Sequence, residues 1–166
     1  MELWQERVDS PLGTIVLVTS GERLCSLDFC GYEDRMHRLL FKRFGAVKLS
    51  ARPEASGAQL ALRAYLGGEL HAFAKIPLCL DGTAFQENVW AALKRIQPGS
   101  TCSYKFIAQD LGKPGASRAV GMANRSNPIA LAIPCHRVIG ANGTLGGYAG
   151  GIEKKKWLLD HERKWA

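Results

Sequence analysis

The chain has 166 residues, of which 46% are hydrophobic and 22% are charged, and its formal net charge at pH 7 is +7. This composition is typical of a globular protein and excludes a disordered tail, a collagen-like fibre and a coiled-coil rod. No apolar run approaches the roughly 20 residues of a membrane-spanning helix, so we expect no membrane segment.

The first 30 residues are predicted to form an antiparallel sheet. Apolar and polar residues alternate in the first strand, β-branched residues dominate the second, and turn residues separate the strands, as is typical of a meander. The expected strands are Leu3–Val8, Thr14–Thr19 and Leu24–Phe29, joined by turns at Ser10–Gly13 and Gly21–Glu22.

Two helices are expected after this sheet. Apolar residues recur at helical spacing in Glu33–Phe44 and again in Ala58–Leu66, and Gly67 and Gly68 end the second helix. The residues themselves indicate an α+β arrangement. Because no catalytic constellation is found in residues 1–81, we interpret this half as a scaffold domain.

Residues 82–166 are expected to form a second, mainly helical domain. Thr83 and Gln86 have the spacing of a capping box, which marks the start of a helix. Pro98 and Gly99 mark the end of that helix.

A helix-turn-helix is predicted within this domain. Ser103 can cap a helix at Tyr104–Leu111, and another short helix is expected at Ala116–Arg125. A turn containing Gly112 joins the two, as in DNA-binding helix-turn-helix motifs, although any helical hairpin produces the same pattern.

The second of these short helices has two unlike faces. Small apolar residues that allow close packing form one face: Ala116, Ala119, Val120 and Ala123. The opposite face carries Arg118, Met122 and Arg125 at spacing i, i+4, i+7. Two guanidinium groups beside a flexible apolar side chain suit a DNA groove, and a solvated face with two incidental arginines is an equally good reading of this helix alone.

The excess of positive charge is confined to residues 82–166. They hold 12 basic and 5 acidic side chains, whereas residues 1–81 hold ten of each. A one-sided excess favours a polyanionic partner, with DNA or RNA first and an anionic membrane surface second. A solvated basic face without a partner is the alternative.

A candidate catalytic cysteine follows the apolar run Ile129–Ile133, which we interpret as a buried strand. The run leads into the sequence Pro-Cys-His-Arg-Val at residues 134–138. A Cys–His pair adjacent in the sequence is more often structural than catalytic. Here, however, a base and a cation follow Cys135, and Glu162 in the last helix could orient His136 in a Cys–His–Glu relay.

The motif Pro134–Val138, preceded by Arg118–Gly121 and Ser126–Pro128, resembles the O6-alkylguanine-DNA alkyltransferase family, and most closely its bacterial Ogt-type members. The matching residues run from Thr83 to Glu162, about half of the chain. The resemblance implies an α/β N-terminal domain with a ribonuclease-H-like sheet. It further implies a mainly α C-terminal domain with a helix-turn-helix and the alkyl-accepting cysteine. We place these domains at residues 1–81 and 82–166.

The resemblance also implies direct repair of DNA. A guanine alkylated at O6 is rotated out of the duplex, because its substituent is otherwise inaccessible in the base stack. Cys135 is activated through a water by His136, with Glu162 behind it, and attacks the alkyl carbon. The alkyl group stays on sulfur, so one molecule repairs one lesion. O4-alkylthymine is left open as a further substrate.

Other residues acquire roles from the same resemblance. Tyr104 matches a tyrosine that donates toward the guanine ring, with a core tyrosine as the alternative. Arg118 fills the gap left by the extruded base, and Asn127 braces the turn between the recognition helix and the active site. Tyr148 forms the pocket wall in a glycine-rich loop. Lys155 aligns with a lysine near the site, although a charge run is more often solvated.

The recognition helix is expected to enter the minor groove of double-stranded DNA. Ser117, Met122 and Arg125 are expected to contact substrate or DNA together with Arg118. Because base flipping and arginine insertion outweigh base readout in that groove, little sequence specificity is expected.

No metal or cofactor is expected. The five cysteines are an odd number without CxxC spacing, which argues against a disulfide framework and a local zinc site. This usage favours a reducing compartment, and the charged N-terminal residues do not resemble a signal peptide. We therefore expect a cytoplasmic monomer.

Two other functions compete with repair. The first is a lesion-recognition module that binds DNA without transfer, which the presence of Cys135 disfavours. The second is a cysteine hydrolase with the same relay, which would need an oxyanion hole and multiple turnovers. A basic helix-turn-helix would be unexplained in a hydrolase.

Overall fold

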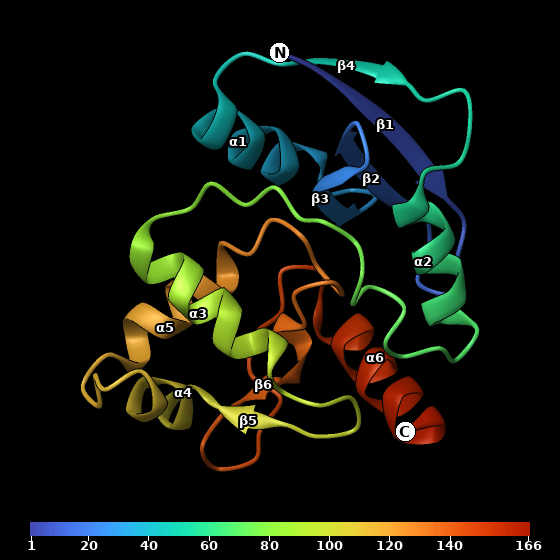
Figure 1. Cartoon of the computed structure of the whole chain (residues 1–166). Coiled ribbons are helices and arrows are strands. Elements are labelled where there is room, and N and C mark those ends of the chain that lie inside the picture. The colour runs from blue at the N-terminus through green and yellow to red at the C-terminus, as the bar shows by residue number, and fades with distance from the viewer. The chain divides into compact units, whose positions relative to one another are not determined.

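A computed structural model describes all 166 residues and divides them into two compact units, Met1–Asp81 and Gly82–Ala166 (Figure 1). The first unit combines a sheet with two helices, and helices predominate in the second. None of the helices has both the length and the apolar composition needed to cross a membrane.

The first unit contains a four-stranded sheet with the order β3-β2-β1-β4. β1 (Glu2–Val8) pairs antiparallel with β2 (Ile15–Ser20), which pairs antiparallel with β3 (Arg23–Phe29). The predicted meander is therefore confirmed. β4 (Lys48–Ala51) pairs parallel with β1 and was not predicted, because a strand of four residues has too few alternations to be recognised.

Two helices complete this unit, α1 (Glu33–Phe44) and α2 (Gly57–Leu66). α1 packs on the sheet through a cluster of buried residues: Leu3, Val16, Val18, Cys25, Met36 and Leu40. Ser56 caps α2 by accepting a hydrogen bond from the Gln59 backbone N–H (3.1 Å). Its own hydroxyl donates to the buried Glu6 carboxylate (2.6 Å), which ties α2 to β1.

The second unit is built on α3 (Ala84–Lys94), α4 (Tyr104–Asp110), α5 (Ser117–Arg125) and α6 (Ile152–Trp165). Thr83 and Gln86 form the expected capping box at the start of α3. α3 packs against α5, where the buried Trp90 donates a hydrogen bond to the Ala123 carbonyl (2.9 Å). Strands β5 (Cys102–Ser103) and β6 (Val138–Ile139) form a short parallel pair.

The prediction of a strand at Ile129–Ile133 is wrong. The segment is buried, but hydrogen bonds from the Ala132 N–H to the Ala130 carbonyl (2.8 Å) and from the Ile133 N–H to the Ile129 carbonyl (3.0 Å) fold it into a compact turn. Leu131 has a φ of 69° there. An apolar run reports burial and does not by itself distinguish one buried conformation from another.

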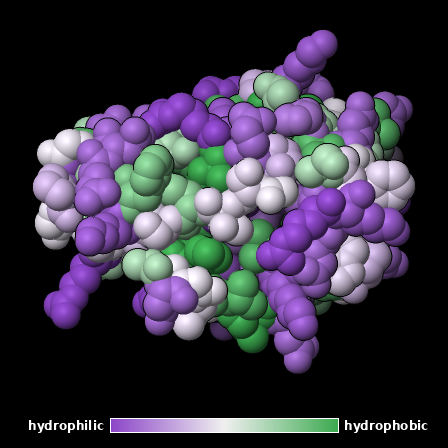
Figure 2. Space-filling view, turned by 90° about the horizontal axis from the view of Figure 1, so that it is seen from below, coloured by the Kyte–Doolittle hydropathy of each residue, from purple (hydrophilic) through white to green (hydrophobic).

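The two faces of α5 are partly as expected. Val120 and Ala123 are buried, whereas Ala119 is exposed, so the predicted apolar stripe is too wide. Met122 is 70% exposed, and Arg118 and Arg125 are exposed beside it. Figure 2 shows one face of the molecule, on which hydrophobic side chains gather toward the middle between hydrophilic ones.

Candidate active site

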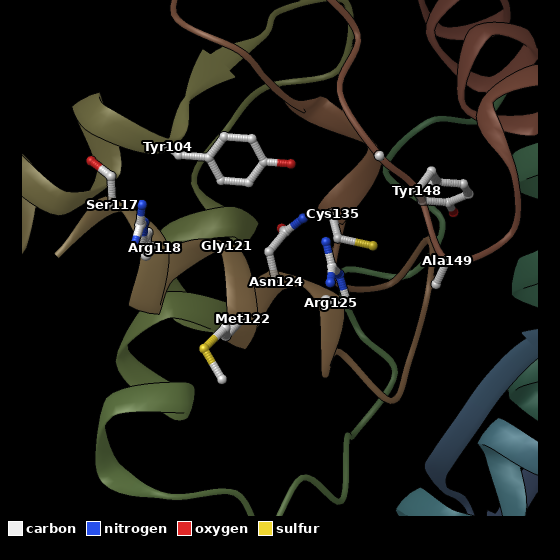
Figure 3. Close-up of a pocket in the computed structure, with 11 residues that line it drawn as sticks. Tyr104, Ser117, Arg118, Gly121, Met122, Asn124, Arg125, Cys135, Tyr148 and Ala149 are labelled. Atoms are coloured by element: carbon white, nitrogen blue, oxygen red, sulfur yellow. The ribbon is translucent and has the colours of Figure 1, made fainter.

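A pocket of about 750 Å³ opens in the second unit, and Cys135 lies in its wall (Figure 3). The pocket is lined from α4, α5, the 3-10 turn that contains Cys135, and the loop before α6. Its lining residues are Tyr104, Ser117, Arg118, Gly121, Met122, Asn124, Arg125, Cys135, Gly147, Tyr148 and Ala149. Because Cys135 is only 6% exposed, small changes in its surroundings decide what can reach its sulfur.

Asn127 holds the segment that delivers Cys135. Its Nδ2 donates to the Ile133 carbonyl (2.8 Å), and its Oδ1 accepts from the Ile129 N–H (2.9 Å). The Cys135 N–H in turn donates to the Ile133 carbonyl (2.7 Å). Both ends of one buried amide thus close the turn that precedes the 3-10 helix η1 (Cys135–Arg137).

A buried ionic network lies behind the cysteine. His136 Nε2 is 2.7 Å from Glu162 Oε1, and both side chains are fully buried. Arg137 contacts both carboxylate oxygens, through Nε at 2.9 Å and Nη2 at 2.8 Å. Its Nη1 donates to the Ile96 carbonyl (2.6 Å). Glu162 therefore receives hydrogen bonds from two neighbours, and Arg137 is the member that the sequence analysis did not include.

The charges in this network follow from its hydrogen bonds. Burial acts to raise the pKa of Glu162, but the hydrogen bonds from His136 and Arg137 outweigh it and hold that pKa well below its usual range. Burial lowers the pKa of His136, opposed by Glu162. The imidazole is therefore neutral near pH 7 beside an ionised carboxylate, so Nε2 carries the hydrogen. Nδ1 is left as a buried acceptor without a protein hydrogen bond.

Tyr104 begins α4 and lines the pocket opposite α5. A side-chain carbon at Gly121 would lie 3.9 Å from the Tyr104 ring, an ordinary van der Waals distance, so the ring and α5 lie side by side. Burial raises the pKa of Tyr104, and a charge on Cys135 would raise it further. Its hydroxyl therefore stays protonated and remains a hydrogen-bond donor.

Two neighbouring rows of α5 meet the pocket. The row Arg118, Met122 and Arg125 is exposed, as the sequence predicted. The adjacent row Ser117, Gly121 and Asn124 has the same spacing and is less exposed. The exposed row can contact a large ligand that lies outside the pocket. The less exposed row faces the inside of the pocket and can contact a group that enters it.

Lys155 is fully buried and supports the loop that forms the pocket wall. Its ammonium donates to the carbonyls of Val138 (2.5 Å), Gly147 (3.3 Å) and Leu145. Burial lowers the pKa of Lys155 to about 8. The solvated alternative for this lysine is therefore wrong, whereas Lys156 next to it is exposed.

The structure brings most of the predicted site residues to one pocket and leaves four beside it. The four that do not line the pocket are His136, Glu162, Asn127 and Lys155. Asn124 also lines the pocket and was not predicted from the sequence. The available signal was its position three residues after Gly121, on the row that starts at Ser117. No group of three or more His, Cys, Asp or Glu side chains gathers as metal ligands would, and the metal-free state stays a prediction.

Two family models match the chain, one on each unit. Residues 5–80 match the 6-O-methylguanine DNA methyltransferase, ribonuclease-like domain. Residues 84–164 match the 6-O-methylguanine DNA methyltransferase, DNA binding domain.

Curated relatives and solved structures agree with these models over nearly the whole chain. A methylated-DNA–protein-cysteine methyltransferase of Shigella flexneri is 42% identical over 166 residues, which cover 98% of this chain and 96% of the relative. The crystal structure of Mycobacterium tuberculosis OGT in complex with DNA has a TM-score of 0.84 and 42% identity, covering 100% of this chain and 95% of that one. The O6-methylguanine-DNA methyltransferase of Pyrococcus kodakaraensis has a TM-score of 0.79 and 29% identity, covering 96% and 98%.

Proposed function

The chain belongs to the 6-O-methylguanine DNA methyltransferase family, and from this premise we propose that it repairs DNA by transferring the alkyl group of O6-alkylguanine to Cys135. The transfer is direct and stoichiometric, and O4-alkylthymine is a second substrate to be tested. The observation that carries the proposal is the position of Cys135 in a pocket wall, on the same short 3-10 helix as His136 and Arg137, which both bind the buried Glu162.

The chemical step is a displacement at the alkyl carbon. The Cys135 thiol gives its proton to Nδ1 of His136, through a water between them, and the sulfur forms a bond to that carbon. The bond between the carbon and O6 breaks, and its electron pair leaves with the guanine. A thioether is stable and nothing in the pocket removes the alkyl group again, so each molecule acts once.

Glu162 and Arg137 prepare His136 for this role. The carboxylate fixes Nε2 as the protonated nitrogen, which presents the lone pair of Nδ1 as the base. When His136 takes up a proton, the ionised Glu162 stabilises the imidazolium, as the acid does in hydrolase triads. Tyr104 donates toward the guanine ring and stabilises the negative charge that develops there.

The base reaches Cys135 by leaving the duplex. The exposed row Arg118, Met122 and Arg125 is placed to approach the DNA, and we assign the helices α4 and α5 as a helix-turn-helix that enters the minor groove. Arg118 fills the gap left by the flipped base. Ser117 and Tyr148 line the pocket that receives it. The first unit, with its ribonuclease-H-like sheet, serves as the scaffold domain.

The same chemistry bears on the cell compartment. A single thiol is consumed per lesion, so the protein needs a reducing compartment such as the cytoplasm. We further propose that the protein acts on double-stranded DNA as a monomer.

The decisive experiment is mass spectrometry of the intact protein and its peptides after incubation with duplex DNA that contains one O6-methylguanine. We expect one methyl group on the peptide with Cys135 and saturation at one equivalent. Cys135→Ser should abolish transfer and bind DNA with nearly unchanged affinity. Methyl transfer to another cysteine would overturn the assignment of the nucleophile.

The alternatives give different results in the same experiment. A lesion-recognition module would bind the duplex and gain no mass. A cysteine hydrolase would turn over beyond one equivalent without a stable thioether.

A further inference from the structure

Two of the five cysteines lie side by side in the first unit. Leu24 on β3 and Leu78 form a parallel bridge. The Leu24 N–H donates to the Pro77 carbonyl (2.8 Å), and the Cys79 N–H donates to the Leu24 carbonyl (2.9 Å). Cys25 and Cys79 each follow one of the bridged leucines. Because side chains alternate along extended segments, both thiols lie on the same face of this pairing.

The spacing of the pair suits a disulfide bond. Paired extended segments lie about 4.8 Å apart, and a disulfide joins Cα atoms that are roughly 4.4–6.8 Å apart. The thiols of Cys25 and Cys79 are within hydrogen-bonding reach of each other, and Cys79 packs against the buried cluster that contains Cys25. Both thiols are free in this structure. A bond between the two sulfurs therefore needs little movement of the backbone.

Arg43, on α1, joins the backbones of the two segments. Its Nη2 donates to the Cys25 carbonyl (2.8 Å). Its Nη1 donates to the carbonyls of Cys79 (3.1 Å) and Leu80 (3.1 Å). One guanidinium thus holds both cysteines in place, and its positive charge favours the thiolate form of Cys25.

The two thiols differ in what can reach them. Cys25 is fully buried, whereas Cys79 is partly exposed. Burial and the neighbouring Cys79 raise the pKa of the Cys25 thiol to about 12, so this thiol stays protonated at neutral pH. An oxidant from solution therefore meets Cys79 first, and Cys25 is the partner that reacts second.

We propose that Cys25 and Cys79 are a redox pair, which small disulfides such as oxidised glutathione convert to a disulfide bond. The Cys79 thiol loses its proton, and its sulfur bonds to one sulfur of the small disulfide, which releases the first small thiol. The Cys25 thiol then loses its proton, and its sulfur displaces the second small thiol from Cys79. Two protein thiols are oxidised, and one small disulfide is reduced to two thiols that take up the two protons.

The bond fastens the end of the first unit to its sheet. Cys25 lies in β3, whereas Cys79 lies two residues before the unit ends at Asp81. The loop that the bond closes includes α1, β4 and α2, so the link restricts a large part of the unfolded chain. The pair is open in a reducing compartment and closes under oxidising conditions, when it makes the first unit harder to unfold.

The test oxidises the folded protein with glutathione disulfide and maps its peptides after the free thiols are blocked. Trypsin places Cys25 on residues 24–35 and Cys79 on residues 76–94. We expect these two peptides to be joined in the oxidised wild type and separated again by dithiothreitol. Cys79→Ser should lose the link. Because the exposed Cys30 shares a peptide with Cys25, Cys30→Ser is the matched control and should keep the link.

Thermal unfolding measures the consequence for stability. Oxidation should raise the unfolding temperature of the wild type by about 5–10 °C, the effect of a typical disulfide on a chain of this size. Cys30→Ser should show the same rise, and Cys79→Ser should show none.

Three results would overturn the inference. The first is an oxidised wild type without joined peptides, whether Cys79 is unreacted or carries glutathione, and this result stands even if Cys79→Ser fails to fold. The second is loss of the link in Cys30→Ser, which would assign it to Cys30. The third is a link that leaves the unfolding temperature unchanged. None of these measurements uses DNA, so failure of the proposed function is a separate result.

Discussion

The two sides of Cys135 differ in how completely their polar groups are bonded. Behind the sulfur, Glu162 accepts hydrogen bonds from both His136 and Arg137, and all three side chains are buried. In front of it, Arg118 and Arg125 are exposed at the pocket, and the buried Oδ1 of Asn124 accepts no hydrogen bond in the protein. Behind the sulfur only Nδ1 of His136 is left without a protein hydrogen bond, whereas the pocket side exposes the groups that would meet a substrate.

This difference separates two kinds of effect. Changes at the rear should reduce reactivity with every alkyl donor and reduce stability as well, because they leave buried charges without partners. Changes at the front should alter the choice among substrates and leave the fold largely intact. Each of the following experiments tests this distinction.

The largest effect is expected for Glu162→Ala. Arg137 and His136 would lose their shared buried acceptor, which should lower the free energy of unfolding by about 3–5 kcal/mol. Urea denaturation measures this loss. Transfer should slow to a similar degree on duplex DNA and on free O6-alkylguanine. Asp160→Ala, an exposed residue on the same helix, is the control, and equal stability in the two variants would contradict the buried network.

Arg118→Ala, unlike Glu162→Ala, should affect the reaction with duplex DNA much more than the reaction with the free base. Repair of a lesion in duplex DNA should slow by about tenfold, because unstacking and unpairing a base costs a few kcal/mol and the arginine offsets part of that cost. Reaction with the free base should be nearly unchanged, since it has no gap to fill. Arg163→Ala serves as a matched loss of an exposed charge. Equal losses on both substrates would remove the flipping role.

The pH dependence of the transfer rate tests the protonation of His136, behind Cys135. Burial lowers the pKa of His136 from its ordinary 6.5, so the neutral imidazole persists below that pH and the transfer rate should fall only under more acidic conditions. Both His136 and Glu162 have lowered pKa values in the folded protein, so their contribution to stability is present at neutral pH and is lost as the pH falls. Single-turnover rates between pH 4.5 and 8 test this, and a decline that begins above 7 would contradict it.

The smallest effect is expected for Arg125→Ala. If its guanidinium neutralises one phosphate, its loss should reduce the slope of log affinity against log salt concentration by about 1. A titration at several salt concentrations measures it. Lys42→Ala, on α1 of the first unit, should leave the slope unchanged, and an equal change in both variants would mean that the contact is not specific.

The sequence predicted the elements better than the contacts that complete the site. Periodicity and caps identified the meander and the starts of α3 and α4, because such signals act over a few residues. The turn at Ile129–Ile133 was misread because burial, not conformation, is what an apolar run encodes. Arg137 and Asn124 were missed as site residues for another reason. The order of the residues does not show that Arg137 turns toward Glu162 or that Asn124 faces the pocket.

The lysine that supports the pocket wall also sets where the chain is free to vary. Lys155 gathers the carbonyls of Val138, Leu145 and Gly147 on one ammonium, and beyond these contacts the exposed tip at residues 141–144 closes on itself, with the Gly140 N–H donating to the Thr144 carbonyl (2.8 Å). A change in the tip should therefore not move the pocket wall. Evolution can lengthen or rewrite it at little cost, and a fluorescent tag or a short inserted peptide carried there should leave the shape of the pocket unchanged.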